Sequence, residues 1–180
     1  MTTVNLYTDG ACSGNQSATN AGGWGAILES GGKTKDLCGG EANTTNNRME
    51  LTGLLEGLRA LKRMNITLNV YSDSAYIVNC FHQKWYVNWQ RNGWKNSKKD
   101  PVENRDLWEA ILDLADQVAD IHFFKVKGHL DINKAADVRK WKAKFEKAYG
   151  PISDQAFAYL TEMNHRVDAL ANEGMAPHKK

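Results

Sequence analysis

The sequence is poor in cysteine and proline, with three residues of each. So few prolines argue against a collagen-like or proline-rich scaffold. Cys12, Cys38 and Cys80 are odd in number, lie far apart and have no Cys-x-x-Cys spacing, so neither a disulfide framework nor a zinc site is expected. We expect reduced, mostly buried thiols, as in a reducing cytosol.

Long hydrophobic runs are also missing. None approaches the ~18 apolar residues that a membrane-spanning helix requires. The first residues, Met-Thr-Thr-Val-Asn-Leu-Tyr-Thr-Asp, lack the basic start and apolar stretch of a signal peptide. We therefore predict a cytoplasmic protein that has no membrane partner.

The composition is that of a globular chain, with 180 residues, 42% hydrophobic and 24% charged. This length favours a single domain over residues 1–180, and a monomer is the default. The net charge of +2 is close to neutral. It hides two basic segments, 84–99 and 138–149, on an otherwise acidic chain, and these segments hold four of the six tryptophans.

The hydrophobic pattern predicts a mixed α/β sheet. Strands are expected at 4–9, 24–29, 33–38, 66–72 and 121–126, with a hairpin turn at 30–32 and a glycine-rich loop at 10–23. Helices are expected around 51–61, after Ser74 as N-cap, around 107–118, over 133–149, and in a stretch ending at 164–172. The order of these elements gives five strands, three antiparallel and the others parallel, flanked by helices.

Two predicted strands end in similar sequences, Tyr-Thr-Asp-Gly at Asp9 and Tyr-Ser-Asp-Ser at Asp73. If the strands are parallel neighbours, their axes lie ~4.8 Å apart. Two carboxylates at that spacing repel each other, and a divalent cation between them relieves the repulsion. The alternative is that each aspartate caps the turn or helix that follows it.

Glu50 lies near the start of the leucine-rich helix. Asn47, three residues before it, makes the pair similar to a capping box, and a glutamate is favoured near a helix N-terminus in any case. Local reasoning therefore favours a capping role. That interpretation fails only if this end of the helix faces Asp9 and Asp73.

Several sequence blocks together carry a resemblance to a known family. They resemble, in order and spacing, the signature blocks of type I ribonuclease H: Tyr-Thr-Asp-Gly-Ala-Cys-x-Gly-Asn (7–15), Thr-Thr-Asn-Asn-Arg-Met-Glu-Leu (44–51), Tyr-Ser-Asp-Ser (71–74), Val-Lys-Gly-His (126–129) and Asn-x-Arg-Val-Asp-x-Leu-Ala (164–171). The resemblance implies a ribonuclease H-like fold and endonucleolytic hydrolysis of the RNA strand of RNA/DNA hybrids. The implied products have 5′-phosphate and 3′-hydroxyl ends, and the implied role is removal of RNA primers and R-loops.

The resemblance also implies a two-metal site. Its metal ligands would be Asp9, Glu50, Asp73 and Asp168, holding two Mg²⁺ ions for which Mn²⁺ can substitute. Mg²⁺ prefers carboxylates and water as ligands, so four acids suit it. His129 corresponds to a mobile histidine that assists proton transfer or product release, and the alternative is an exposed loop histidine without a function.

The family analogy assigns further residues to the hybrid. Asn15, Asn46 and Asn47 would meet 2′-hydroxyls of the RNA in the minor groove. Thr45 and Asn104 resemble the positions that hold a DNA phosphate, with Arg48 as a helper. Turn and cap chemistry is the alternative for such polar residues, and both roles can hold together.

Segment 84–99 resembles the basic protrusion of some family members. It is basic, has no acidic residue, and interleaves tryptophans with lysines. We expect a mixed role, in which Lys95, Lys98 and Lys99 face the DNA strand while Trp85 and Trp89 contact substrate or pack inward.

The sequence departs from the family by an insertion of about residues 131–163 before the last block. Its part 138–149 is expected to form an extra helix, whose basic face extends the substrate channel or merely decorates the surface. The insertion also raises the question of which aspartate is the fourth carboxylate, because Asp131 and Asp137 are nearer to His129 in the sequence than Asp168 is. Only the surrounding motif favours Asp168. The loop at 16–21 is longer too, and Ala75 replaces a side chain that is commonly polar.

Other functions fit the residues less well. A proofreading-type exonuclease typically begins with Asp-x-Glu, whereas Gly10 and Ala11 follow Asp9. An integrase-like role rests on the fold alone. A non-catalytic module that binds RNA/DNA hybrids is the main alternative, and it would usually have lost one of the four carboxylates.

Overall fold

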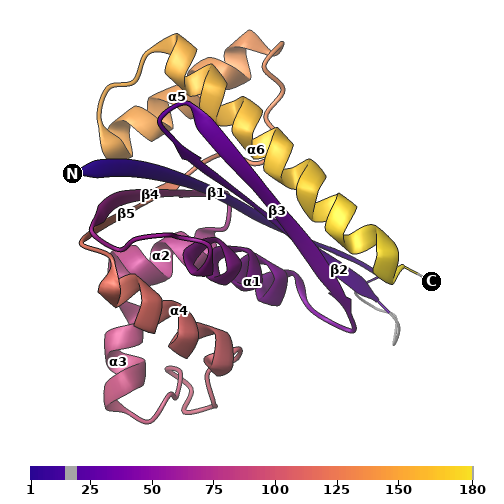
Figure 1. Cartoon of the computed structure of the whole chain (residues 1–180), viewed down its shortest axis with the longest axis vertical. Coiled ribbons are helices and arrows are strands. Elements are labelled where there is room, and N and C mark those ends of the chain that lie inside the picture. The colour runs from indigo at the N-terminus through magenta and orange to yellow at the C-terminus, as the bar shows by residue number, and fades with distance from the viewer. Residues whose placement is uncertain (15–19, 180) are drawn as a thin grey trace.

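The computed structural model describes residues 1–14 and 20–179. Its centre is a five-stranded sheet in the order β3-β2-β1-β4-β5 (Figure 1). The strands are β1 (Thr2–Ser13), β2 (Ala21–Ser30), β3 (Lys33–Ala42), β4 (Ile66–Ser72) and β5 (Asp120–Lys125). β1, β2 and β3 pair antiparallel, whereas β4 runs parallel to both β1 and β5. The predicted mixed sheet is confirmed.

Helices cover both faces of this sheet (Figure 1). They are α1 (Asn46–Arg59), α2 (Ala75–Gln83), α3 (Trp85–Arg91), α4 (Arg105–Gln117), α5 (Ala135–Tyr149) and α6 (Asp154–Met175), followed by the short 3-10 helix η1 (Ala176–His178). α1, α2 and α4 lie on one side and α5 and α6 on the other. None of the helices in the described part of the chain is long and apolar enough to cross a membrane.

Each face of the sheet has its own hydrophobic core, because neighbouring strand residues point to opposite sides. Leu6 is fully buried beneath α1, whose leucines form the expected apolar stripe. Tyr7 packs on the other side with residues of α5 and α6. The two cores hold the two helical layers against β1.

The first two strands extend further than the glycine-rich sequence predicts. β1 continues past Asp9 to Ser13, and β2 begins at Ala21, so residues 10–13 and 21–23 are not loop. The glycines allow close packing there. A Cβ on Gly23 would lie 2.5 Å from the backbone N of Met175 in α6. The prediction treated these glycines as turn signals, whereas tertiary packing requires them.

The insertion builds part of the second core. Phe145 of α5 is buried against Phe124 of β5, and Phe157 of α6 packs on Phe145. α6 runs without a break from the insertion into the last sequence block. Removing residues 131–163 would therefore strip one core of its packing, so a deletion cannot test the insertion's role in activity.

The three thiols differ in their surroundings. Cys80 is buried, Cys12 is partly exposed, and Cys38 is exposed on β3. The expectation of mostly buried thiols is therefore wrong, because Cys38 alternates outward on an edge strand.

Candidate active site

Asp9, Glu50 and Asp73 come together from three elements. Thr8 pairs with Ser72 across the parallel strands β1 and β4, so Asp9 and Asp73 follow at the same level. One oxygen of each of the three carboxylates lies within 4.8 Å of the others. The sequence prediction that the two aspartates lie side by side is confirmed, although β1 continues beyond Asp9 instead of ending there.

Glu50 faces the aspartates and does not cap its helix. The N-cap of α1 is Thr45, whose Oγ1 accepts a hydrogen bond from the Arg48 backbone N at 3.1 Å. Gly10 allows the helix to approach β1, since a Cβ there would lie 2.7 Å from the carbonyl carbon of Met49 and 2.9 Å from Cα of Glu50. The capping-box interpretation of Asn47 and Glu50 is therefore wrong.

Asp168 reaches the same place from the other face of the sheet. Gly25 of β2 pairs with Asp9, and a Cβ on Gly25 would lie 2.6 Å from the carbonyl oxygen of Val167 in α6. Asp168, the next residue, lines a cavity of about 390 Å³ together with Asp9, Glu50 and Asp73. Among the described residues, neither Asp131 nor Asp137 lines this cavity.

His129 lies at the mouth of this cavity. Its side chain is 78% exposed, and Nε2 lies 3.8 Å from Oδ1 of Asp168. The backbone is in the left-handed region at φ 56°. The preceding Gly128 packs against Asp73, since a Cβ there would lie 2.5 Å from the Asp73 carboxylate. The exposed histidine therefore lies next to Asp168, on a segment that packs against Asp73.

Burial and mutual repulsion raise the proton affinity of the site. Burial, followed by the charge of Asp73, raises the pKa of Asp9 to about 8. Burial, followed by the charges of Asp9 and Asp73, raises the pKa of Glu50 well above its usual value. Glu50 Oε2 is buried and has no hydrogen-bond partner among the described residues. Close carboxylates with an unpartnered oxygen suit a hard divalent cation.

We predict that the metal-free protein loses stability as the pH rises from about 4 to about 8. Because the folded-state pKa of Asp9 is raised to about 8, its contribution is fully present below the ordinary pKa of the carboxyl and is lost as the pH rises through the folded-state value. The loss should reach about 5 kcal/mol, since each tenfold change in proton affinity corresponds to about 1.4 kcal/mol. Thermal melts across this range in chelator measure it, and Mg²⁺ should restore the lost stability at pH 8. A melting temperature that is flat with pH in chelator would contradict the prediction.

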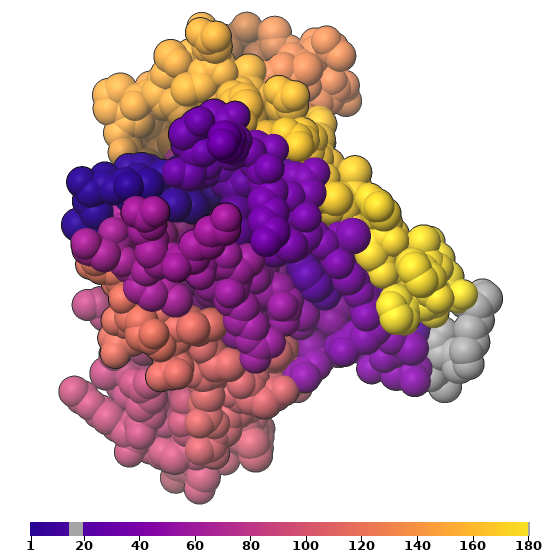
Figure 2. All heavy atoms as spheres, viewed as in Figure 1, coloured from indigo at the N-terminus to yellow at the C-terminus, as the bar shows by residue number. Residues whose placement is uncertain are grey.

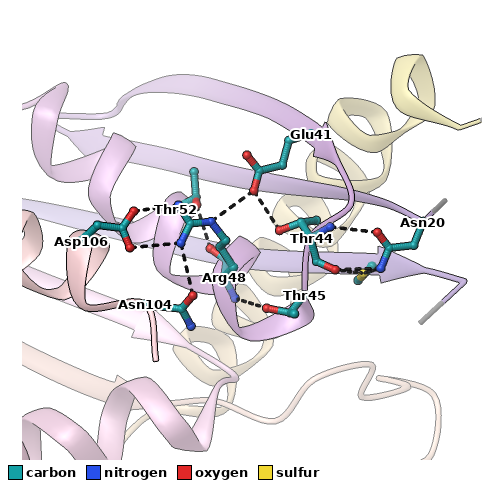
Figure 3. Close-up of polar contacts among 9 residues, drawn as sticks. Asn20, Glu41, Thr44, Thr45, Arg48, Thr52, Asn104 and Asp106 are labelled. Carbon is teal, nitrogen blue, oxygen red and sulfur yellow. Dashed lines mark hydrogen bonds and ion pairs between the residues drawn. The ribbon is translucent and has the colours of Figure 1, made fainter. Parts of the chain in front are cut away.

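A second polar network surrounds Arg48 (Figure 3). The guanidinium donates to Asp106 (Nη2 to Oδ2, 2.8 Å) and to Oδ1 of Asn104 (Nη1, 3.3 Å), and its Nε lies 3.5 Å from Glu41. Asn104 and Thr45 thus both use an acceptor atom within the network. The Asn104 amide NH₂ and the Thr45 hydroxyl hydrogen are donor groups that could meet an anion.

This network pairs the charge of Arg48 with Asp106 and Glu41 and brings its guanidinium to Asn104. The role of Arg48 as a helper at a DNA phosphate stays a prediction. Neither carboxylate was predicted from the sequence, nor was Asn20, which exchanges hydrogen bonds with the Thr44 backbone at 2.7 and 2.9 Å. Asp106 is 58 positions from Arg48. Nothing in the local sequence of Asp106 or Glu41 signals a contact with Arg48.

The asparagines assigned to RNA differ in what the structure describes. Asn46 and Asn47, in the first turn of α1, are exposed and line the carboxylate cavity. Ala75 lines it too. Asn15 and most of the longer loop at 16–21 lie outside the described residues.

In segment 84–99, the tryptophans pack inward and the lysines are exposed. Trp89 lies 5.6 Å from Trp108 and 5.9 Å from Trp94, measured between ring centroids. Trp85 packs on the same core and is partly buried. Lys95, Lys98 and Lys99 are exposed. Packing therefore explains both tryptophans, and their contact with substrate stays a prediction.

Comparisons with known proteins agree with this geometry. The family model described as RNase H matches residues 1–143. A protein named Ribonuclease H from Symbiobacterium thermophilum is 52% identical over 132 residues, which cover 73% of this chain and 86% of that protein. Another, from Moorella thermoacetica, is 51% identical over 131 residues, covering 73% and 83%. Asp168 lies beyond the range that the family model matches.

Solved structures are similar in fold over nearly the whole chain. LC9-RNase H1, described as a type 1 RNase H with the type 2 active-site motif, has a TM-score of 0.71 at 25% identity, covering 99% of this chain and 74% of that one. LC11-RNase H1, solved in complex with an RNA/DNA hybrid, has a TM-score of 0.59 at 19% identity, covering 97% of each chain.

Proposed function

Since this chain belongs to the ribonuclease H family and is a ribonuclease H enzyme, we propose that it hydrolyses the RNA strand of RNA/DNA hybrids at the carboxylate cavity. The observation that carries the proposal is the convergence of Asp9, Glu50 and Asp73 within 4.8 Å. A fourth carboxylate, Asp168, lines the same cavity. The products would carry 5′-phosphate and 3′-hydroxyl ends.

The four carboxylates are proposed to hold two Mg²⁺ ions, for which Mn²⁺ can substitute. The fit rests on an all-oxygen donor set and on the buried Glu50 Oε2, which has no hydrogen-bond partner among the described residues. Bound cations would neutralise the scissile phosphate, activate water and stabilise the leaving 3′ oxygen. Asp9 and Asp73 would supply ligands from the sheet, Glu50 from α1 and Asp168 from α6.

His129 is proposed to move a proton or assist product release. Its Nε2 lies 3.8 Å from Asp168, so the carboxylate can orient the ring. The exposed side chain can swing between the cavity and water. An imidazole ring can both donate and accept a proton, which suits both tasks.

Hybrid recognition is proposed to use two faces of α1. Asn46 and Asn47, together with Asn15, would contact 2′-hydroxyls of the RNA strand. Thr45 and Asn104, oriented by Arg48, would donate to a phosphate of the DNA strand. Lys95, Lys98 and Lys99 are proposed to extend the DNA contact, with the edges of Trp85 and Trp89 beside them.

The remaining features of the proposal concern the whole chain. We propose one domain over residues 1–180, with a basic protrusion at 84–99 and an inserted helical segment at about 131–163. Three further points stay predictions: that the protein is a monomer, that it is located in the cytoplasm, and that it removes RNA primers and R-loops.

Cleavage selectivity tests the proposal directly. Labelled RNA/DNA hybrid, RNA duplex and DNA duplex are incubated with Mg²⁺, with and without chelator. We expect only the RNA strand of the hybrid to be cut, and only without chelator. A protein that binds hybrid but leaves it intact in both Mg²⁺ and Mn²⁺ would instead be the non-catalytic binding module.

A further inference from the structure

Three lysines surround the partly buried Trp141 of α5. The Nζ atoms of Lys127, Lys140 and Lys144 lie 5.1, 5.3 and 4.3 Å from the centre of its ring. Lys127 follows β5, whereas the other two belong to α5. We call these four residues the Trp141 cluster. The insertion thus places Lys140 and Lys144 next to Lys127, which lies outside the insertion.

The charge of the Trp141 cluster is not compensated inside the protein. In the described part of the chain, none of its three lysines has a carboxylate within ion-pair distance. Lys142, by contrast, lies 3.0 Å from Asp154 and 3.9 Å from Glu146. The ring attracts each ammonium group, but the like charges repel one another. Bound anions would relieve that repulsion.

Lys127 connects the cluster to the carboxylate cavity through the chain. Lys127 immediately precedes Gly128, which packs against the Asp73 carboxylate, and His129 follows. The other basic segment, around α3, lies at the opposite end of the molecule's long dimension from α5, with the sheet between them (Figure 2). The two cationic segments therefore flank the sheet that carries Asp9 and Asp73.

The helix that carries the cluster is anchored to the sheet. Phe145, one turn along α5 from Trp141, is buried in the second core, and the hydroxyl of Tyr149 accepts a hydrogen bond from the Lys125 backbone N at 2.7 Å. α5 is thereby fixed to β5 before any ligand binds. Cations placed in advance lose less entropy when they bind an anion.

We propose that the Trp141 cluster binds phosphates of the strand being cut, next to the scissile position, so that the duplex is held on both sides of the carboxylates. This proposal rests on the proposed function, because the polyanion in question is the hybrid. The cut strand is the one concerned, since Lys127 shares its loop with His129 beside Asp73. The inserted helix would then be part of the substrate surface.

The test compares two variants with the same loss of charge. Lys140→Ala/Lys144→Ala removes two cations of the cluster. Lys62→Ala/Arg63→Ala removes two exposed cations just before β4, whose far end leads into Asp73 and whose length is about 23 Å. Both are combined with Asp9→Asn so that the hybrid stays intact, and dissociation constants are measured from 50 to 200 mM KCl in Mg²⁺.

The cluster variant should bind hybrid about tenfold more weakly at 50 mM salt, with a salt slope lower by about two. The control variant should match its parent in both quantities. In the enzyme with Asp9 intact, the cluster variant should raise KM and leave kcat unchanged. Equal affinities and slopes for the two double variants would overturn the proposal. The proposed function is tested separately, by measuring whether the unmodified protein cleaves the hybrid.

Neutral methylphosphonate linkages test the strand assignment. Placed in the RNA strand beside the cut, they should weaken binding of the parent more than binding of the Lys140→Ala/Lys144→Ala variant, which keeps only Lys127 of the three lysines. Placed at the matching positions of the DNA strand, they should weaken both equally. The reverse pattern would show that the cluster meets the other strand and would overturn the assignment.

Discussion

Asp9→Asn is expected to abolish cleavage of the hybrid, with a loss on the order of 10³-fold or more, while hybrid binding survives. Asp9 is 3% exposed and lies between Glu50, Asp73 and Asp168. An amide keeps the shape of the side chain but removes the negative charge that a cation requires. Single-turnover cleavage and a binding titration in Mg²⁺ measure the two effects separately.

The same substitution should stabilise the metal-free protein at pH 8. Burial and the charge of Asp73 raise the pKa of Asp9 to about 8, so ionising it opposes folding. Removing that charge should add about 5 kcal/mol, which raises the melting temperature by about 10 °C or more. Asp116→Asn, at an exposed position of α4, is the matched control and should change neither activity nor stability. A variant that melts lower than the parent at pH 8 in chelator would refute the electrostatic account of the site.

Gly10→Ala is expected to cost both stability and activity. The added methyl would meet only backbone, including the carbonyl carbon of Met49 at 2.7 Å and Cα of Glu50 at 2.9 Å. No side chain can rotate away from it, so α1 must move relative to β1. We expect a loss of about 1–3 kcal/mol in stability. Since Glu50 moves with the helix, kcat should fall by about 10²-fold or more.

A second glycine separates the two effects of this substitution. Gly32, in the β2–β3 hairpin, has φ +78° and nothing within 4 Å of an added Cβ. Gly32→Ala should therefore lose about 1–2 kcal/mol through backbone strain while keeping its activity at a temperature where both variants are folded. Equal activity of the two variants under those conditions would show that Gly10 does not position Glu50.

Much of the fold follows from local patterns. β4 begins and ends at the residues that its apolar alternation predicts, and Ser74 caps α2 by accepting from the Ile77 backbone N at 3.2 Å. The hairpin turn predicted at residues 30–32 also forms, with Ser30 paired to Lys33. Strand alternation, N-caps and tight turns involve neighbours along the chain, so the sequence itself contains the information.

The positions of the candidate catalytic residues could be predicted from local sequence only in part. Asp9 and Asp73 could be placed together because parallel strands align their carboxyl ends. Glu50 could not, since its local sequence is equally that of a helix cap. Asp168 was predicted from its motif alone. Its separation from His129 along the chain does not indicate where α6 places it in the fold.

Contacts between distant segments decided these cases. Gly10 and Gly25 lack side chains, which lets α1 and α6 approach β1 and β2 from opposite faces and bring Glu50 and Asp168 to Asp9. In the sequence, Gly10 looks like a loop residue and Gly25 is one position of a predicted strand. The chain therefore specified its strands, helices and first pair of carboxylates locally. The approach of Glu50 and Asp168 to Asp9, and that of Lys127 to Trp141, exists only because packing joins distant segments.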